Sequence, residues 1–144
     1  MKKVELSKQL RRLAAIYNIY KFADLPTRSV RCCTCGIKLP LNPEDPDQDR
    51  GLWGHFIPRS KSKYLSFHPW NSAAQCSKCN VQLNGNEAQF EIFIKQQYGE
   101  EALEFLKQEK VQKTLLDSYE LENYIEEYQV LISELESKLG IKLI

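Results

Sequence analysis

Apolar residues near both ends of the chain recur every three or four positions, which is the spacing of one face of an α-helix. Near the N-terminus this spacing predicts an amphipathic helix over residues 3–23, ending before Pro26. Near the C-terminus it predicts a long helix over 114–139, ending at Gly140. The two apolar stripes are Leu6, Leu10, Leu13, Ile16 or Tyr17, and Tyr20, and then Leu121, Ile125, Tyr128, Ile132, Leu135 and Leu139.

Two shorter helices are expected just before the last one. Phe90, Phe93 and Ile94 share a face over residues 89–98, and Gly99 is a suitable helix stop. Leu103 and Leu106 predict a further helix over residues 100–108.

The middle of the chain has a different character, because residues 24–86 are rich in Pro, Gly, Cys and Asn. Short strands are expected at 29–32, 52–58 and 65–67. The pattern as a whole predicts an α+β fold in three segments. These are a basic N-terminal helix over 1–24, a cysteine-containing core over 25–86 and a helical C-terminal extension over 87–144.

Composition supports a globular protein of 144 residues, since 42% of them are hydrophobic. No apolar run approaches the roughly 20 residues of a membrane span, so no membrane partner is expected. The first residues lack the apolar stretch of a signal peptide. Five cysteines is an odd number, which disfavours a fully paired disulfide framework and favours metal binding in a reducing cytoplasmic compartment.

The net charge of +1 conceals an asymmetry along the chain. Residues 1–80 hold 14 basic and 6 acidic residues, whereas residues 81–144 hold 6 basic and 13 acidic ones. A basic surface around the cysteine region would suit a polyanionic substrate such as DNA. Attraction between oppositely charged helices is the alternative explanation.

Two Cys-x-x-Cys pairs lie about 40 residues apart, Cys32 with Cys35 and Cys76 with Cys79. Each such turn lets two thiolates reach one ion, and four thiolates are typical of a closed tetrahedral zinc site. The sequence therefore predicts a structural zinc bound by these four residues. Cys33 is expected to lie outside that shell.

The acidic stretch Asp45-x-Asp47-x-Asp49 has carboxylates at the spacing of the first ligands of a calcium loop. The glycine of such a loop would fall one place late, at Gly51, and Phe56 stands where a glutamate ligand belongs. We therefore expect residues 42–50 to form a solvated acidic loop.

Two histidines, His55 and His68, lie between the two cysteine pairs, and His55 follows Gly54 in an apolar, strand-like setting. Asn71 precedes the second pair, and Asn80 directly follows it at the start of an expected helix. Arg59, Lys61 and Lys63 come soon after the histidine. A histidine in such a place is often purely structural, but its basic and amide-bearing neighbours suggest chemistry.

This order of residues resembles the zinc-bearing HNH, or ββα-metal, nucleases, and most closely the phage NinG/Rap recombination endonucleases. The resemblance rests on Gly54-His55-Phe56, on Gln75 to Asn80 and on Leu83 to Asn86, and it extends over about residues 30–110. It implies a small ββα-metal core that hydrolyses phosphodiesters in branched DNA, in the cytoplasm of a bacterial host. Zinc would be structural, and magnesium or manganese would be the catalytic divalent cation.

The resemblance also implies roles for individual residues. His55 would be the general base, Asn71 would hold the loop and orient His55 through a hydrogen bond, and Asn80 would be an oxygen ligand of the divalent cation. Arg59, Lys61 and Lys63 would contact DNA phosphates. Many such nucleases have an acidic metal ligand just before the histidine, where this chain has Gly54.

Three questions stay open from the sequence. His68 is either a further ligand or phosphate contact or an exposed loop residue. The chain as a whole is either a nuclease or a non-catalytic zinc module that binds nucleic acid or has a regulatory role. The apolar stripe of the last helix is covered either by the basic N-terminal helix or by a second copy in a homodimer.

Overall fold

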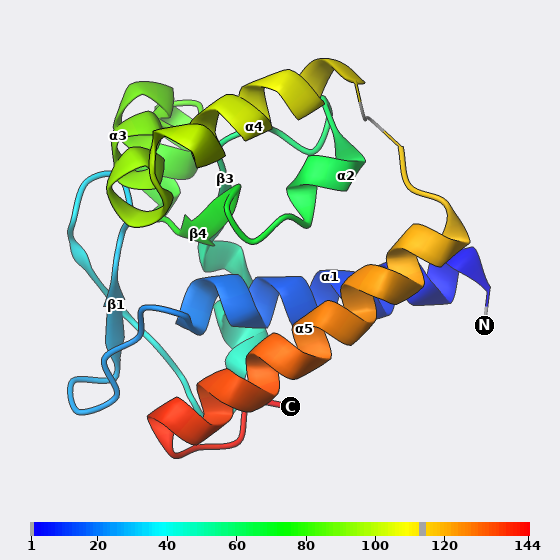
Figure 1. The fold of residues 1–144 in the computed structure, drawn as a ribbon. Helices are drawn as coiled ribbons and strands as arrows, with labels where there is room; N and C mark the ends of the chain where they lie inside the picture. Colours follow the sequence, from blue (N-terminus) through cyan, green and yellow to red (C-terminus); the bar gives the residue numbers. More distant parts are fainter. Residues whose placement is uncertain (1, 113–114) are drawn as a thin grey trace.

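The computed structural model describes residues 2–112 and 115–144. Two long helices form one side of the molecule, and the short strands and remaining helices lie against them (Figure 1). The mixture of helices and small antiparallel sheets confirms the α+β class. The helices are α1 (Lys3–Tyr20), α2 (Lys63–Ser66), α3 (Glu87–Tyr98), α4 (Glu100–Gln112) and α5 (Ser118–Leu139), with a 3₁₀-helix η1 (Pro46–Leu52) and a π-helical turn η2 (Lys78–Gln82).

Helix α5 packs along α1, so the apolar stripe of α5 is buried within the chain (Figure 1). Tyr128 and Ile132 have no exposed surface, and Leu10 and Ile16 of α1 lie in the same cluster. The N-terminal helix is thus the element that covers the stripe. The last helix starts at Ser118, after the N-cap Asp117, and ends at Gly140 in the left-handed conformation. The predicted start at Thr114 lies outside the described residues.

The four strands form two separate two-stranded antiparallel sheets. Strand β1 (Ser29–Arg31) pairs with β2 (Lys38–Pro40), and β3 (Trp53–His55) pairs with β4 (Ser72–Ala74). In the second sheet His55 lies opposite Ser72. The predicted strands over 29–32 and 52–58 are present in shorter form.

The strand predicted over 65–67 is wrong, because this segment belongs to the short helix α2. The Ser62 side chain caps the helix by accepting a hydrogen bond from the Leu65 amide at 3.1 Å. Leu65 and Phe67 then pack into two different hydrophobic clusters. Two apolar residues spaced by two positions are too few to distinguish a strand from a single helical turn.

The interpretation of 42–50 as a solvated loop is also wrong in part. Residues 46–52 form η1, and the Asp49 carboxylate is buried. It accepts hydrogen bonds from the Tyr20 hydroxyl at 2.5 Å and from the Asn42 amide at 2.9 Å. Asp49 therefore connects η1 to the end of α1, whereas Asp45 and Asp47 remain exposed as expected.

A chain of buried polar groups links the two long helices to the segment between α2 and β4. Tyr128 of α5 donates to the Phe67 carbonyl, and the Asn18 amide group donates to Tyr128 at 3.0 Å. The Lys21 ammonium donates to Asn18 at 2.8 Å and to the carbonyls of Pro69 and Ser72 at 2.6 and 2.8 Å. Burial lowers the pKa of Lys21 to about 7. The terminal helices thereby hold in place the segment that pairs with His55.

A second, smaller hydrophobic cluster lies between α3, α4 and the segment after β3. Its fully buried members include Phe90, Ile94 and Leu106. Helix α3 ends at Gly99, as the sequence predicted, and this glycine has a φ of +93°. None of the described helices has the length and apolar character needed to cross a membrane.

Candidate functional site: a cysteine cluster beside His55

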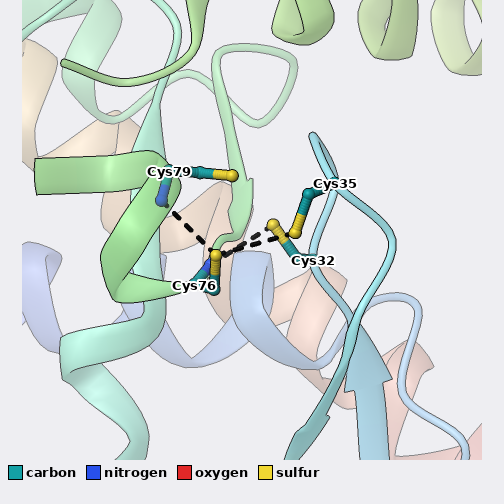
Figure 2. A group of neighbouring side chains, drawn as sticks. All are labelled: Cys32, Cys35, Cys76 and Cys79. Atoms are coloured by element: carbon teal, nitrogen blue, oxygen red, sulfur yellow. Dashed lines mark hydrogen bonds between the residues drawn. The ribbon is translucent and has the colours of Figure 1, made fainter. Parts of the chain in front are cut away.

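The four predicted metal ligands come together between the turn that joins β1 to β2 and the turn that follows β4 (Figure 2). The sulfur atoms of Cys32, Cys35, Cys76 and Cys79 all lie within 4.8 Å of one another. The sulfurs of Cys35 and Cys76 are 3.7 Å apart. In a tetrahedral zinc site with Zn–S bonds of about 2.3 Å, neighbouring sulfurs are about 3.8 Å apart. The cluster therefore has the dimensions and the donor set for a structural metal such as zinc.

Local backbone geometry aims the sulfurs at one another. Gly36 has a φ of +80°, which allows the tight turn after the first pair. Backbone amides donate to the sulfurs, Cys76 to Cys32 at 3.3 Å and Cys79 to Cys76 at 3.4 Å. The Asn86 side chain donates to the Cys79 sulfur at 3.5 Å. Such bonds stabilise thiolates, the form in which cysteine binds a metal.

Cys33 is outside this cluster, as predicted. Its amide donates to the Ala74 carbonyl at 2.9 Å, and its side chain packs against the second hydrophobic cluster. Burial raises the pKa of the Cys33 thiol above its usual range. Cys33 is a packed residue between the first cysteine turn and strand β4.

His55 ends strand β3 and is partly buried. Its Nε2 is 2.9 Å from the Ser66 carbonyl oxygen. Because a carbonyl only accepts hydrogen bonds, Nε2 carries the proton and Nδ1 keeps a free lone pair. The imidazole stacks on Trp53 with 4.5 Å between ring centroids. Burial, together with the nearby Arg59 guanidinium, lowers the pKa of His55 to about 3, so the ring is neutral at physiological pH.

The Asn71 side chain forms hydrogen bonds with the segment after β3, but its partner is Ile57 rather than the predicted His55 ring. Its side-chain oxygen accepts from the Ile57 amide at 2.8 Å, and its side-chain nitrogen donates to the Ile57 carbonyl at 3.0 Å. The predicted hydrogen bond from Asn71 to the His55 ring is replaced by that from Nε2 to Ser66. Asn71 thus holds the backbone two residues beyond His55, and the end of α2 orients the imidazole.

The structure gives a reason for glycine directly before the histidine. A Cβ atom on Gly54 would lie 2.1 Å from Oε1 and 2.5 Å from Cβ of Gln75. The Gln75 side chain is fully buried and donates to the Thr34 hydroxyl at 3.1 Å and the Gly85 carbonyl at 2.8 Å. Gln75 therefore crosses β3 and ties the first cysteine turn to the turn after the second. The space that an acidic side chain at position 54 would occupy belongs to Gln75.

We expect the substitution Gly54→Ala to destabilise the protein by about 1–3 kcal/mol, the usual cost of overpacking a filled core. The added methyl group must displace Gln75 and break its two hydrogen bonds. Gly51→Ala is the matched control, because a Cβ there meets no atom within 4 Å. Urea unfolding of the two variants and the parent measures the difference. Equal unfolding midpoints for Gly54→Ala and Gly51→Ala would contradict this account of Gln75.

Asn80 lies in the π-helical turn η2, partly buried and directly after Cys79 of the cysteine cluster. The backbone amide of Asn80 donates to the Cys76 carbonyl at 2.9 Å, so the backbone at Asn80 is held to the cysteine turn. The following turn returns to strand β3. The Gly85 amide donates to the Cys79 carbonyl at 2.9 Å, and a Cβ on Gly85 would lie 3.6 Å from the His55 carbonyl oxygen. The cysteine turn and His55 are therefore parts of one packed unit.

The three predicted DNA-binding residues differ in their settings. Arg59 places its guanidinium carbon 4.8 Å from the centre of the Trp53 ring, on the residue that stacks with His55. Lys61 is exposed in the loop before α2, and Lys63 is exposed in its first turn. Burial and the nearby positive charges of Arg11 and Arg50 lower the pKa of Arg59. The structure thus adds Arg11 and Arg50 to the basic surface. Helical spacing placed Arg11 on the basic first helix, but no sequence signal linked it or Arg50 to His55.

His68 is neither an exposed loop residue nor a free ligand. Its Nδ1 accepts a hydrogen bond from the Trp70 amide at 3.1 Å. Its ring lies 4.9 Å from that of Trp70 and 5.2 Å from that of Phe105. Burial and the Lys21 ammonium lower its pKa to about 4. His68 therefore has a packing role in the turn before Asn71.

Comparison with known proteins agrees with the pattern of these residues. The sequence matches the model of one protein family over residues 8–138, and that family is described as bacteriophage lambda NinG protein. The comparisons with curated proteins and with solved structures give no significant match. The matched region includes all four clustered cysteines, His55, Asn71 and Asn80. The chain therefore belongs to the NinG family.

Proposed function

We propose that this protein is a structure-selective DNA endonuclease that hydrolyses phosphodiesters in branched recombination intermediates. The observation that carries the proposal is the bond between His55 Nε2 and the Ser66 carbonyl. It leaves Nδ1 unprotonated, and the lowered pKa keeps the ring neutral. A fixed imidazole with one free nitrogen is placed to accept a proton from water, and a bound divalent cation, which lowers the pKa of that water, would offset the weak basicity of the ring.

The arrangement around His55 supports an HNH-like, ββα-metal core. Strands β3 and β4 form an antiparallel pair, and the second cysteine turn follows β4 and leads to η2 and α3. His55 ends the first strand and Asn80 stands where the helical part begins. The zinc that we expect at the cysteine cluster would be structural, because four thiolates leave no open position for a substrate.

In the proposed reaction, His55 Nδ1 takes a proton from a water molecule that attacks the scissile phosphorus. Ser66 holds the imidazole from the opposite side, and Asn71 holds the backbone at Ile57. A bound magnesium or manganese ion would stabilise charge on the phosphate and the departing oxygen. Its protein ligand would be the side-chain oxygen of Asn80.

The donor set limits how the divalent ion would be held. Among residues 2–112 and 115–144, the cysteine cluster is the one group of three or more His, Cys, Asp or Glu side chains close enough to share an ion. The side-chain oxygen of Asn80 would therefore be a protein ligand of the ion without a cluster of carboxylates to help it. Magnesium commonly keeps several waters and binds substrate phosphates. We accordingly propose that the ion binds together with DNA and only weakly to the free protein.

Positive charge beside His55 supports DNA as the substrate. We propose that Arg59, Lys61 and Lys63 contact the phosphates flanking the cleaved bond. Helix α5 packs along α1, and its acidic residues would repel phosphate, so we propose that the DNA follows the basic residues instead. A host-cell cytoplasmic location and a homodimer also remain proposals. The apolar stripe of α5 is covered by α1, so a dimer would have to use another surface.

The alternative function is a zinc module that binds nucleic acid, or regulates, without cutting it. Such a module needs the cysteine cluster and the basic surface, but not a neutral imidazole with a fixed tautomer. The His55 environment therefore favours the nuclease.

The direct test is a cleavage assay with purified protein, magnesium or manganese, and branched, nicked and linear DNA of equal length. We expect cleavage that requires the divalent ion and is fastest on branched DNA. Binding to all three substrates without cleavage under every metal condition would favour the alternative function instead.

A further inference from the structure

A cavity of about 550 Å³ lies where the N-terminal part of α1, helix α2 and the segment leading into α5 meet. In Figure 1 these elements come together on the right-hand side of the molecule. Sites for small molecules commonly measure about 300–1,000 Å³. The cavity is thus large enough for one small organic group rather than a single ion.

One part of the lining is strongly basic. Lys3 and Arg11 come from α1, Arg59 from the loop after β3, and Lys63 from α2. In the described parts of the chain, the ion pairs within 4 Å involve other cations, so these four are not neutralised by a carboxylate. Unpaired cations gathered at one cavity suit an anion with several oxygen atoms.

The other part of the lining is apolar. Phe67 directly follows α2, and Leu115, Leu116 and Leu121 belong to the segment that leads into α5 and to its first turn. Leu115 is 72% exposed although it is large and apolar. An apolar wall offers nothing to a phosphate alone, whereas it suits the face of a base or a sugar. The two parts together match the chemistry of a nucleotide.

Two residues of the lining also belong to the surroundings of His55. Ser66, whose carbonyl accepts from His55 Nε2, is part of the lining. Arg59 lines the cavity and also covers Trp53, the ring on which His55 stacks. The cavity therefore shares Ser66 and Arg59 with the immediate surroundings of His55.

We propose that this cavity binds one unpaired nucleotide of a DNA strand, next to the bond that His55 serves. Arg11, Arg59 and Lys63 hold its phosphate, and the leucine wall contacts its base or sugar. A base inside a duplex is stacked and paired, so it can reach such a wall only after leaving the helix, whereas an unpaired base is free to enter. This inference rests on the proposed function, and it gives a physical basis for selecting branched over fully paired DNA.

The test compares Arg11→Ala with Lys8→Ala. Both residues are exposed on α1 and both substitutions remove one positive charge, but Arg11 lines the cavity and Lys8 does not. Binding is measured without magnesium or manganese on two probes, a branched oligonucleotide with an unpaired arm and a fully paired duplex of equal length. We expect Arg11→Ala to weaken binding of the branched probe about tenfold, and binding of the duplex much less. Lys8→Ala should weaken binding of the two probes slightly and to the same extent.

A second variant tests the apolar wall. Leu115→Gln changes an exposed side chain, so it should leave the fold intact. We expect it to weaken binding of the branched probe and to leave duplex binding unchanged. If Arg11→Ala and Leu115→Gln affect both probes equally, or if Arg11→Ala behaves as Lys8→Ala does, the nucleotide site is refuted.

This outcome is separate from that of the cleavage assay. If the parent protein cuts DNA but none of the three variants discriminates between the two probes, the proposed nuclease function stands and the proposed nucleotide site is refuted. If the parent protein cuts no DNA but Arg11→Ala and Leu115→Gln selectively weaken binding of the branched probe, the nucleotide site stands and the proposed nuclease function is refuted.

Discussion

Replacing His55 with alanine is expected to lower the rate of DNA cleavage by about 10²–10⁴, the usual contribution of a well-placed general base. Binding of DNA and the zinc content should be retained, because His55 belongs to neither the cysteine cluster nor the basic surface. Single-turnover cleavage of branched DNA, with binding measured separately, checks both parts. A variant that cuts at the parent rate would remove His55 from the mechanism.

His55→Gln is the companion variant, because alanine also leaves the Ser66 carbonyl without its partner. The glutamine amide can still donate to that carbonyl, but it is not a base. Both variants should therefore lose cleavage, while His55→Gln should unfold closer to the parent protein in urea. Loss of activity in both, with near-parent stability in His55→Gln, separates the chemical role of the ring from its structural one.

The lowered pKa of His55 also predicts the pH dependence of kcat/KM, which reports the free enzyme. The base form is the unprotonated ring, which exists above the pKa, and a pKa of about 3 keeps the ring in that form throughout the neutral range. An unperturbed histidine, with a pKa of about 6.5, would lose about three quarters of its base form at pH 6. We therefore expect no loss of kcat/KM through this group between pH 8 and pH 6. A fall of about fourfold over that range would show a normally titrating imidazole.

Replacing Cys76 with serine is expected to remove the metal and unfold the core. Structural zinc contributes about 10–16 kcal/mol in small zinc domains, which equals or exceeds the 5–15 kcal/mol by which most domains are stable. Cys76 also accepts the amide of Cys79 and lies in the main hydrophobic cluster, so the site and the core form together. The zinc content of the purified protein and its far-ultraviolet circular dichroism measure the two effects.

Cys33→Ser is the matched control, since Cys33 neighbours a ligand but lies outside the cluster. It should keep one zinc per chain and most of its stability. A parent protein without zinc, or a Cys33→Ser protein that loses metal as completely as Cys76→Ser, would refute the structural zinc site.

Local patterns in the sequence were enough to predict most helices and the clustering of the four cysteines. Stripes such as that of α5 repeat over many turns, so packing cannot easily override them, and Gly99 and Gly140 end their helices through a local backbone requirement. A Cys-x-x-Cys turn brings two sulfurs together by itself, so pairing the two turns required only that the chain fold back once. The segment over 65–67 is too short for its periodicity to decide between strand and helix.

The setting of His55, in contrast, depends on contacts between residues far apart in the sequence. The sequence by itself determined the four clustered cysteines, the two long helices and the residue types expected near His55. Only the tertiary structure decided that Ser66 rather than Asn71 holds the imidazole, that Gln75 fills the space beside Gly54, and that Arg11 joins Arg59 at one cavity. The physical reason is the sequence distance over which each effect acts, because turn geometry and helical periodicity involve residues only a few positions apart. Hydrogen-bond partners and charge clusters are set by which side chains meet when α1, α2, β3 and α5 pack together.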